Sequence, residues 1–236
     1  MGHRHILPGE PPIEVELRQS ARARRMTLRV AARDGRVTLT VPRGVRVSDA
    51  LAFAEEKRGW LGRHLAKVEP LRPLRIGDEV PIEGRAHRVT VGAGRAARTE
   101  DGALIVPARA AEVPGQAVKA FLKVLARDRL VAASDHYSSL LGRPYARITL
   151  RDTRSRWGSC STTGSLNYSW RLAMAPADVL AYVAAHEVAH LDQMNHSAAF
   201  WAVVARLYPD YDAPRRWLRA HGAEHHRIVL DARAAV

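Results

Sequence analysis

Residues 179–191 read VLAYVAAHEVAHL, and this stretch decides how the rest of the chain is interpreted. Its alanine, valine and leucine residues would point to every side of a helix, and a helix that is apolar all round is normally buried. Only four side chains break the pattern: Tyr182, His186, Glu187 and His190. The stretch therefore predicts a core helix in which each of these few polar side chains needs a binding partner.

Two of these side chains have the spacing of metal ligands. His186 and His190 are four residues apart, so at about 100° per residue they lie roughly 40° apart on one helix face and can reach one ion. Glu187 is placed to act on a water molecule beside that ion. This is the HExxH pattern, in which two histidines bind zinc and the glutamate is the general base. Polar core residues without a metal would each need another partner or cost several kcal/mol.

A third ligand is expected, because a catalytic zinc site takes three protein ligands and keeps one position open. His196 lies six residues after His190, which on an unbroken helix would be about 240° round and out of reach. The polar residues near Gln193 predict a helix stop there and a return of the chain that brings His196 to the metal. Glu224 is the alternative ligand; His196 is favoured because a short return orders less chain.

Composition and charge bound the classes of protein. The 236 residues are 47% hydrophobic, enough for one large domain or two small ones, and 37 Lys and Arg against 24 Asp and Glu give a net charge of +13. That surplus fits an acidic partner or simply an arginine-rich surface. The single cysteine, Cys160, excludes an internal disulfide, and no signal peptide or membrane-spanning run is present in the sequence. We expect a cytoplasmic protein without membrane contact.

The first part of the chain alternates apolar and polar residues in short runs. We expect a disordered N-terminus over residues 1–12, a β-rich region with one helix over 13–111, and a boundary near Glu112 in a proline- and alanine-containing linker. Runs 26–30 and 37–41 predict a hairpin about Asp34–Gly35, and residues 48–69 a helix. Nine arginines and one acid lie between Arg18 and Arg46.

The second part, residues 112–236, is expected to hold the site. A helix is predicted over 116–141, strands over 146–151 and 166–172, and an irregular polar segment over 154–164. Arg156, Asn167 and Arg171 flank the predicted cleft and are candidate substrate-binding residues; pairing of the arginines with nearby acids is the alternative. The histidines after Gly222 are expected to be exposed.

Three segments resemble one known family: RWGSCS at 156–161, LNYSWRL at 166–172 and HEVAHLDQMNHSAAFW at 186–201. They are similar to the YgjP-like metallopeptidases, relatives of the SprT-like and other zincin metalloproteases. The resemblance implies that His186, His190 and His196 bind Zn²⁺, that Glu187 is the base, and that an edge strand above the metal helix binds extended substrate. We provisionally expect one of the two predicted strands to be that edge.

These observations together predict an α+β protein, in which a zincin-like domain with the HExxH helix on a small sheet follows a β-rich N-terminal region. The principal prediction is a zinc-dependent metallopeptidase acting on peptides or proteins. One alternative is a metal-dependent nucleotide pyrophosphatase converting UTP to UMP and diphosphate, an activity attributed to the family that the chain resembles. The other is a DNA-associated SprT-like protease or a basic nucleic-acid-binding module, with the basic N-terminal region as the contact.

Overall fold

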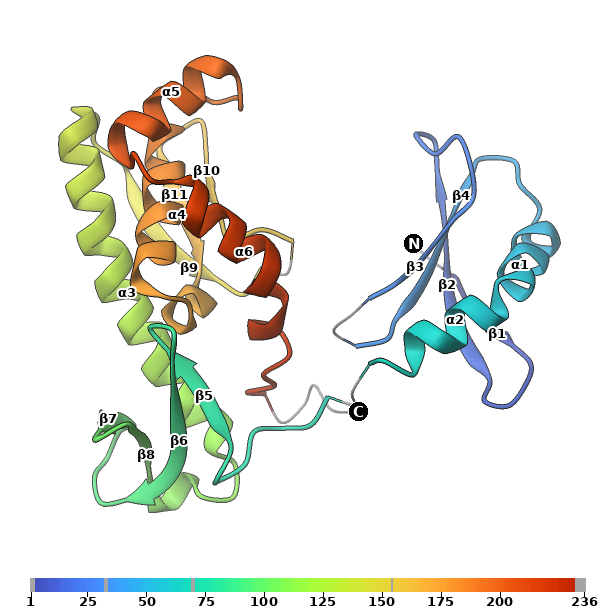
Figure 1. Ribbon diagram of the computed structural model, residues 1–236, viewed down its shortest axis with the longest axis horizontal. Coiled ribbons are helices and arrows are strands. Elements are labelled where there is room, and N and C mark those ends of the chain that lie inside the picture. Colours follow the sequence, from blue (N-terminus) through green and yellow to red (C-terminus); the bar gives the residue numbers. More distant parts are fainter. Residues whose placement is uncertain (1–2, 32–33, 69–70, 154, 232–236) are drawn as a thin grey trace. The chain divides into compact units, whose positions relative to one another are not determined.

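The computed structural model describes residues 3–31, 34–68, 71–153 and 155–231. The chain divides into two compact units, Met1–Leu71 and Arg72–Val236, here termed unit 1 and unit 2. Each unit has its own hydrophobic core, and each combines helices with small mixed sheets (Figure 1). The predicted α+β class with a β-rich N-terminal region is confirmed. Within the described residues, no helix has both the length and the apolar character to span a bilayer.

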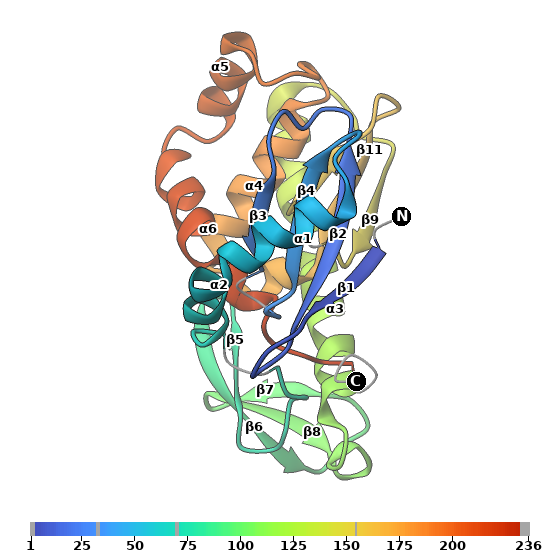
Figure 2. The same cartoon turned by 90° about the vertical axis from the view of Figure 1, so that its right-hand side faces the viewer.

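Unit 1 is a four-stranded sheet with two helices on one face (Figures 1 and 2). Its sheet has the order β1-β2-β4-β3, and its elements are β1 His3–Leu7, β2 Ile13–Ser20, β3 Thr27–Val30, β4 Val37–Pro42, α1 Val47–Glu56 and α2 Arg58–Leu65. Alternate apolar residues along β2 and β4, such as Val15 and Leu39, are fully buried against α1 and α2, as period-two patterning requires. The hairpin predicted between β3 and β4 is present.

Three features of this region differ from expectation. Residues 3–7, expected to be disordered, form β1, because the whole of this strand pairs with β2 from Leu17 to Ile13. The helix expected over 48–69 is two helices that meet at Lys57, and Glu69 lies outside the described residues. The units divide after Leu71 rather than near Glu112, because the strands after residue 72 bury their apolar side chains in the core of unit 2.

Unit 2 contains two sheets and a set of helices. The first sheet has the order β5-β6-β8-β7, with β5 Glu79–Ile82, β6 Arg85–Gly92, β7 Arg98–Glu100 and β8 Ala103–Pro107, and it repeats the topology of the sheet in unit 1. A 3₁₀ turn, η1 Ala108–Ala110, leads into the long helix α3 Pro114–Leu141, which Gly142 ends in a left-handed conformation. The expected linker is thus a continuous connection between strand and helix.

The second sheet of unit 2 has the order β10-β11-β9. Its strands and the elements that follow are β9 Arg147–Arg151, β10 Gly158–Cys160, β11 Ser165–Ser169, η2 Trp170–Met174, α4 Ala177–Ala189, α5 Ala198–Leu207 and α6 Asp212–His225. The strand β10 lies in the segment expected to be irregular. It is an edge strand, because it pairs only with β11 among the named strands, and β11 occupies the centre.

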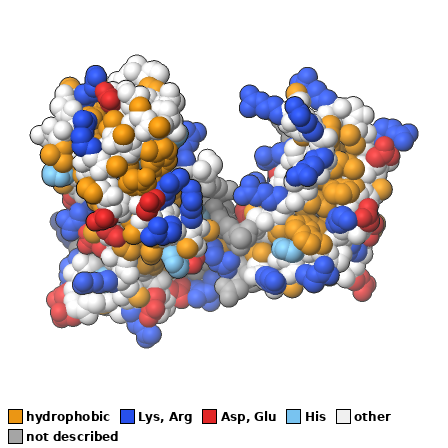
Figure 3. All heavy atoms as spheres, turned by 45° about the horizontal axis from the view of Figure 1, so that its top comes forward, with side chains coloured by type: hydrophobic (Ala, Val, Ile, Leu, Met, Phe, Trp, Pro, Cys, Tyr) orange, Lys and Arg blue, Asp and Glu red, His pale blue; other side chains and the backbone are white. Residues whose placement is uncertain are grey.

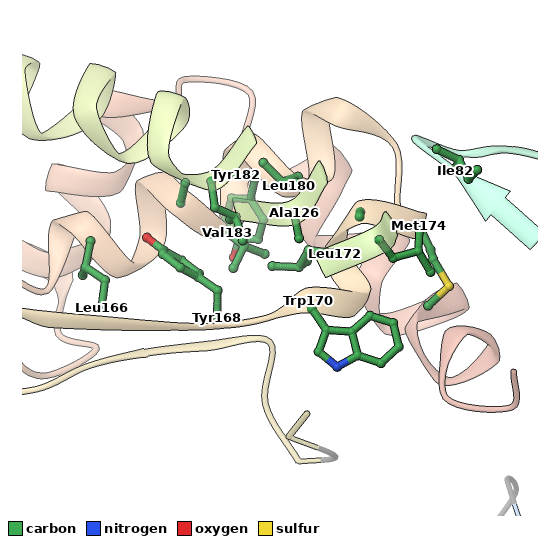
Figure 4. Packing of buried hydrophobic residues seen from close by; sticks show 14 of the residues in the cluster. Ile82, Ala126, Leu166, Tyr168, Trp170, Leu172, Met174, Leu180, Tyr182 and Val183 are labelled. Carbon is green, nitrogen blue, oxygen red and sulfur yellow. The ribbon is translucent and has the colours of Figure 1, made fainter. Parts of the chain in front are cut away.

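The core of unit 2 gathers around α4. Tyr168 and Trp170, from β11 and the turn after it, pack with Leu180, Val183 and other apolar side chains of the same cluster (Figure 4). Small residues, such as Ala184, Ala185 and Ala189, let α3 and the sheet approach α4 closely, so it is covered on most of its surface. The buried-helix prediction for residues 179–191 is confirmed up to its end, which comes at Ala189.

Candidate active site

Three histidine side chains converge at the C-terminal end of α4. One ring nitrogen from each of His186, His190 and His196 lies within 4.8 Å of the other two. The Nε2 atoms of His186 and His196 are 3.1 Å apart. Two ring nitrogens at that distance need a shared proton or a cation between them, and three converging ones are an arrangement that suits a metal ion.

The chain returns to the site because α4 stops early. The helix ends at Ala189, and the turn after it carries His190 and Gln193 before α5 begins. Ser197 caps α5 by accepting a hydrogen bond from the backbone N–H of Phe200, at 3.4 Å. The ring of Phe200 in turn stacks on His190, with centroids 4.4 Å apart. This tight helix–turn–helix connection is what places His196 beside the two helical histidines.

Hydrogen bonding and burial favour the neutral form of His186 and His190. His190 Nδ1 lies 2.9 Å from the carbonyl oxygen of Gln193, and because a carbonyl can only accept, Nδ1 carries the proton and Nε2 keeps its lone pair. Burial lowers the pKa of His186 to about 3, with further lowering by the charges of His190, His196 and Arg215. Burial also lowers the pKa of His190. A neutral imidazole is the form that binds a metal.

Glu187 lies beside the histidines and is 5% exposed. Burial raises the pKa of this carboxyl to about 8, against the lowering effects of the Arg156 charge and of the backbone N–H of Cys160, which donates to the carboxylate. Its Oε2 atom is buried and has no hydrogen-bond partner among the described residues. A buried oxygen of this kind, next to converging histidine nitrogens, is suited to holding a water molecule.

The carboxylate of Glu187 rests directly against the edge strand β10. A Cβ atom added to Gly158 would lie 2.5 Å from Glu187 Oε1 and 2.6 Å from Glu187 Cγ. The backbone of Gly158 has no positive φ, so the glycine is required by space rather than by conformation. A residue without a side chain at this position is therefore what lets the carboxylate and the strand approach each other.

The free edge of β10 borders the cavity. Trp157 O accepts from Ser169 N at 2.8 Å and Ser161 N donates to Ser165 O at 3.0 Å, so alternation along the ladder turns the backbone groups of Gly158 and Cys160 away from β11. The cavity has a volume of about 620 Å³ and is lined by the three histidines, Glu187, β10 and apolar side chains that include Trp157 and Leu218. An extended ligand could pair with this edge.

The structure treats the three predicted substrate-binding residues differently. Arg156 is exposed and lines the cavity. Asn167 lies in the central strand β11, outside the residues that line the cavity, with its amide 3.5 Å from Ser165 O. Arg171 is 6% exposed and turned away: its guanidinium donates to Asp152 at 2.9 Å and to the carbonyl oxygen of His225 at 2.7 Å. Arg171 thus follows the alternative expectation, in which the arginine pairs with a nearby acid.

Two residues near the C-terminus bear on other expectations. Glu224, the alternative ligand, lies on α6 and pairs with His221 at 3.3 Å rather than joining the histidine cluster. His225, expected to be exposed, is 5% exposed and packs between Trp157 and Trp217. Arg171 donates hydrogen bonds to the carbonyl oxygens of His225 and Ile228, and these bonds hold the end of α6 against the core, where His225 is buried.

Sequence reasoning missed the contribution of residues 157–160. Trp157, Gly158 and Cys160 line the cavity, and two of them touch Glu187. A three-residue strand has too little sequence for an alternation signal, although a glycine next to a tryptophan in a polar segment was a usable hint. Burial and the nearby Glu187 charge raise the pKa of the Cys160 thiol to about 11, so this cysteine stays protonated.

The chain is similar to one family of known proteins and to a solved structure. None of the curated proteins matches the chain. The crystal structure of the metallopeptidase zymogen of Pyrococcus abyssi abylysin is similar over 42% of this chain and 98% of that one, with 20% sequence identity and a TM-score of 0.36. The family described as YgjP-like, metallopeptidase domain matches residues 24–221, from unit 1 to α6. Because that match spans most of the sequence, the chain belongs to the YgjP-like metallopeptidase domain family.

Proposed function

We propose that the protein is a zinc-dependent metallopeptidase that holds Zn²⁺ with His186, His190 and His196 and uses Glu187 as its general base. The observation that carries this proposal is the convergence of three histidine nitrogens within 4.8 Å beside a buried carboxylate oxygen that has no partner among the described residues. Membership of a metallopeptidase family supports a hydrolase. The all-nitrogen donor set favours zinc, copper, iron or nickel over calcium or magnesium, and zinc is the usual metal of the HExxH pattern.

The proposed chemistry is hydrolysis of a peptide bond by water. Zinc, when bound, supplies Lewis-acid activation of the water and of the scissile carbonyl group. Burial alone raises the pKa of Glu187, and the positive charge of a bound zinc ion would lower it again and favour the ionised carboxylate. In that form Glu187 takes a proton from the water on its buried carboxylate and returns it to the nitrogen of the leaving amine. The turn carbonyl of Gln193 keeps His190 in the tautomer that binds through Nε2.

We also propose that the substrate peptide lies extended along β10. The backbone groups of Gly158 and the carbonyl of Cys160 face away from β11 and have no backbone partner among the described residues, whereas the N–H of Cys160 donates to Glu187. We therefore place the substrate on the edge strand β10 rather than on β9 or β11, one of which was provisionally expected to take this role. Trp157 and Leu218 would contact a substrate side chain, and Arg156 a carboxylate of the substrate.

A peptide fits the cavity better than a nucleoside triphosphate, the first alternative expected from the sequence. A nucleoside triphosphate calls for several cations around its phosphates, and the described residues that line the cavity include one arginine, Arg156. The other alternative places nucleic acid on the basic N-terminal region, outside this cavity. The cytoplasmic location expected from the sequence stays a prediction.

The test is turnover by the Glu187→Gln variant. The zinc-loaded protein should cleave an unstructured protein such as casein, and Glu187→Gln should bind the same amount of zinc while its kcat falls by about a thousandfold or more. Glu224→Gln, which changes an exposed carboxylate of α6 outside the histidine cluster, is the matched control and should keep full activity. Undiminished cleavage by Glu187→Gln would show that another group is the base.

A further inference from the structure

Unit 1 brings two arginine-bearing loops to one end of its sheet. Strands β2 and β4 run parallel, with Ser20 opposite Pro42, and β3 starts beside the end of β4, with Thr27 opposite Thr40. The loop after β2, residues 21–26, and the loop after β4, residues 43–46, therefore leave the sheet at the same end. Two segments that are separated in the sequence by two strands, β3 and β4, therefore lie at the same end of the sheet.

The two loops carry exposed arginines that have no acidic partner. We term the four of them the arginine cluster: Arg22, Arg24, Arg25 and Arg43. Among the described residues none of these four forms an ion pair, whereas nearby Arg18 and Arg36 contact Glu16 and Arg46 contacts Asp49. Figure 3 shows Lys and Arg side chains gathered on this part of unit 1. The positive charge of the cluster is therefore not neutralised by acidic side chains among the described residues, and it attracts a negatively charged partner.

We propose that the arginine cluster binds the phosphate backbone of double-stranded nucleic acid. Guanidinium groups bind phosphate oxygens through paired, charge-assisted hydrogen bonds, and several on adjacent loops match successive phosphates. The two loops contain no aromatic residue on which an unpaired base could stack, which favours a duplex over a single strand. Backbone contacts of this kind give affinity without sequence specificity.

The composition of the loops separates this partner from a membrane surface. An anionic bilayer is usually held by basic residues together with apolar side chains that enter the lipid. No large apolar side chain of residues 20–26 or 43–46 is exposed; the nearest one is Val47, which is 41% exposed. A single valine is a small apolar surface, so the cluster matches phosphates presented on a polar, regularly spaced backbone.

The experiment is a salt titration of duplex binding by the full-length protein. A fluorescein-labelled DNA duplex of arbitrary sequence is titrated at several NaCl concentrations with the wild type, with Arg24→Gln/Arg25→Gln, and with Arg63→Gln/Lys67→Gln, a control that removes the same charge elsewhere in unit 1. Each lost phosphate contact reduces the slope of log affinity against log salt by about 0.9. Between 50 and 200 mM salt the double cluster variant should therefore lose about tenfold less affinity than the wild type.

The control variant should bind nearly as tightly as the wild type, and Arg24→Lys/Arg25→Lys should retain most of the binding because it keeps the charges. Equal weakening by the cluster and control variants would reduce the effect to net charge and overturn the proposal. The absence of duplex binding at 50 mM salt would also overturn it, as would binding only to vesicles that contain anionic lipid. Circular dichroism of each variant shows that the fold is kept.

Discussion

Replacing Gly158 by alanine tests how the edge strand and the proposed base are fitted together. The added Cβ would lie 2.5 Å from Glu187 Oε1, whereas ordinary van der Waals contact begins near 3.4 Å. The carboxylate would therefore have to move by about 0.9 Å, since Glu187 is the more flexible partner. A misplacement of about 1 Å in a catalytic group can cost about 100-fold in rate, which is about 2.7 kcal/mol of activation free energy.

The assay compares kcat and KM for cleavage of an unstructured peptide by zinc-loaded Gly158→Ala and wild type. We expect kcat to fall by about 100-fold while zinc content is unchanged, because the three atoms nearest to the added Cβ all belong to Glu187. The same substitution in the Glu187→Gln background should cause no further loss, since the strain acts through the carboxylate. Full activity of Gly158→Ala, or an equal loss in both backgrounds, would refute the reasoning.

Three further predictions concern side chains of unit 2. Arg171→Gln should lower the free energy of unfolding, measured by urea titration, by about 3 kcal/mol, because it leaves Asp152 and two carbonyl oxygens without their donor. Arg156→Gln should leave the free energy of unfolding unchanged and should raise KM, measured by kinetics of peptide cleavage. Burial lowers the pKa of His225 to about 4 from its usual 6.5. As pH falls, His225 is therefore protonated in the unfolded chain before it is protonated in the folded one. The free energy of unfolding of the zinc-free protein should therefore fall by up to about 3 kcal/mol between pH 6.5 and 4, and that of zinc-free His225→Phe should fall by less. Parallel curves of unfolding free energy against pH for the two proteins would contradict this.

The sequence predicted the parts of the fold that repeat over many residues. The buried α4 was readable because an apolar surface on all sides is distinctive, and β3 and β4 because their alternation flanks Asp34–Gly35. Other features depended on contacts that sequence does not carry. β1 forms because β2 offers it a partner, and the unit boundary lies after Leu71 because the core of unit 2 recruits the strands that precede α3.

The same division holds at the candidate site. The spacing of His186 and His190 follows from helix geometry, and the return of His196 from polar residues that end a helix. The burial of Arg171 in an ion pair and the position of β10 beside the cavity could not be predicted from residue spacing. A buried arginine paired with Asp152 and an exposed one in a cleft have the same letter in the sequence, and Gly158 is required only because Glu187 reaches it from another element.

Zinc content of the purified protein tests the central claim most directly. Elemental analysis of the wild type, loaded with zinc and passed through a desalting column, should give about one zinc per chain. His196→Ala should lose most of that zinc, because two histidines make a much weaker site, while Glu224→Ala should keep all of it. Full zinc retention by His196→Ala, or no zinc in the wild type, would contradict the three-histidine site on which the proposed function rests.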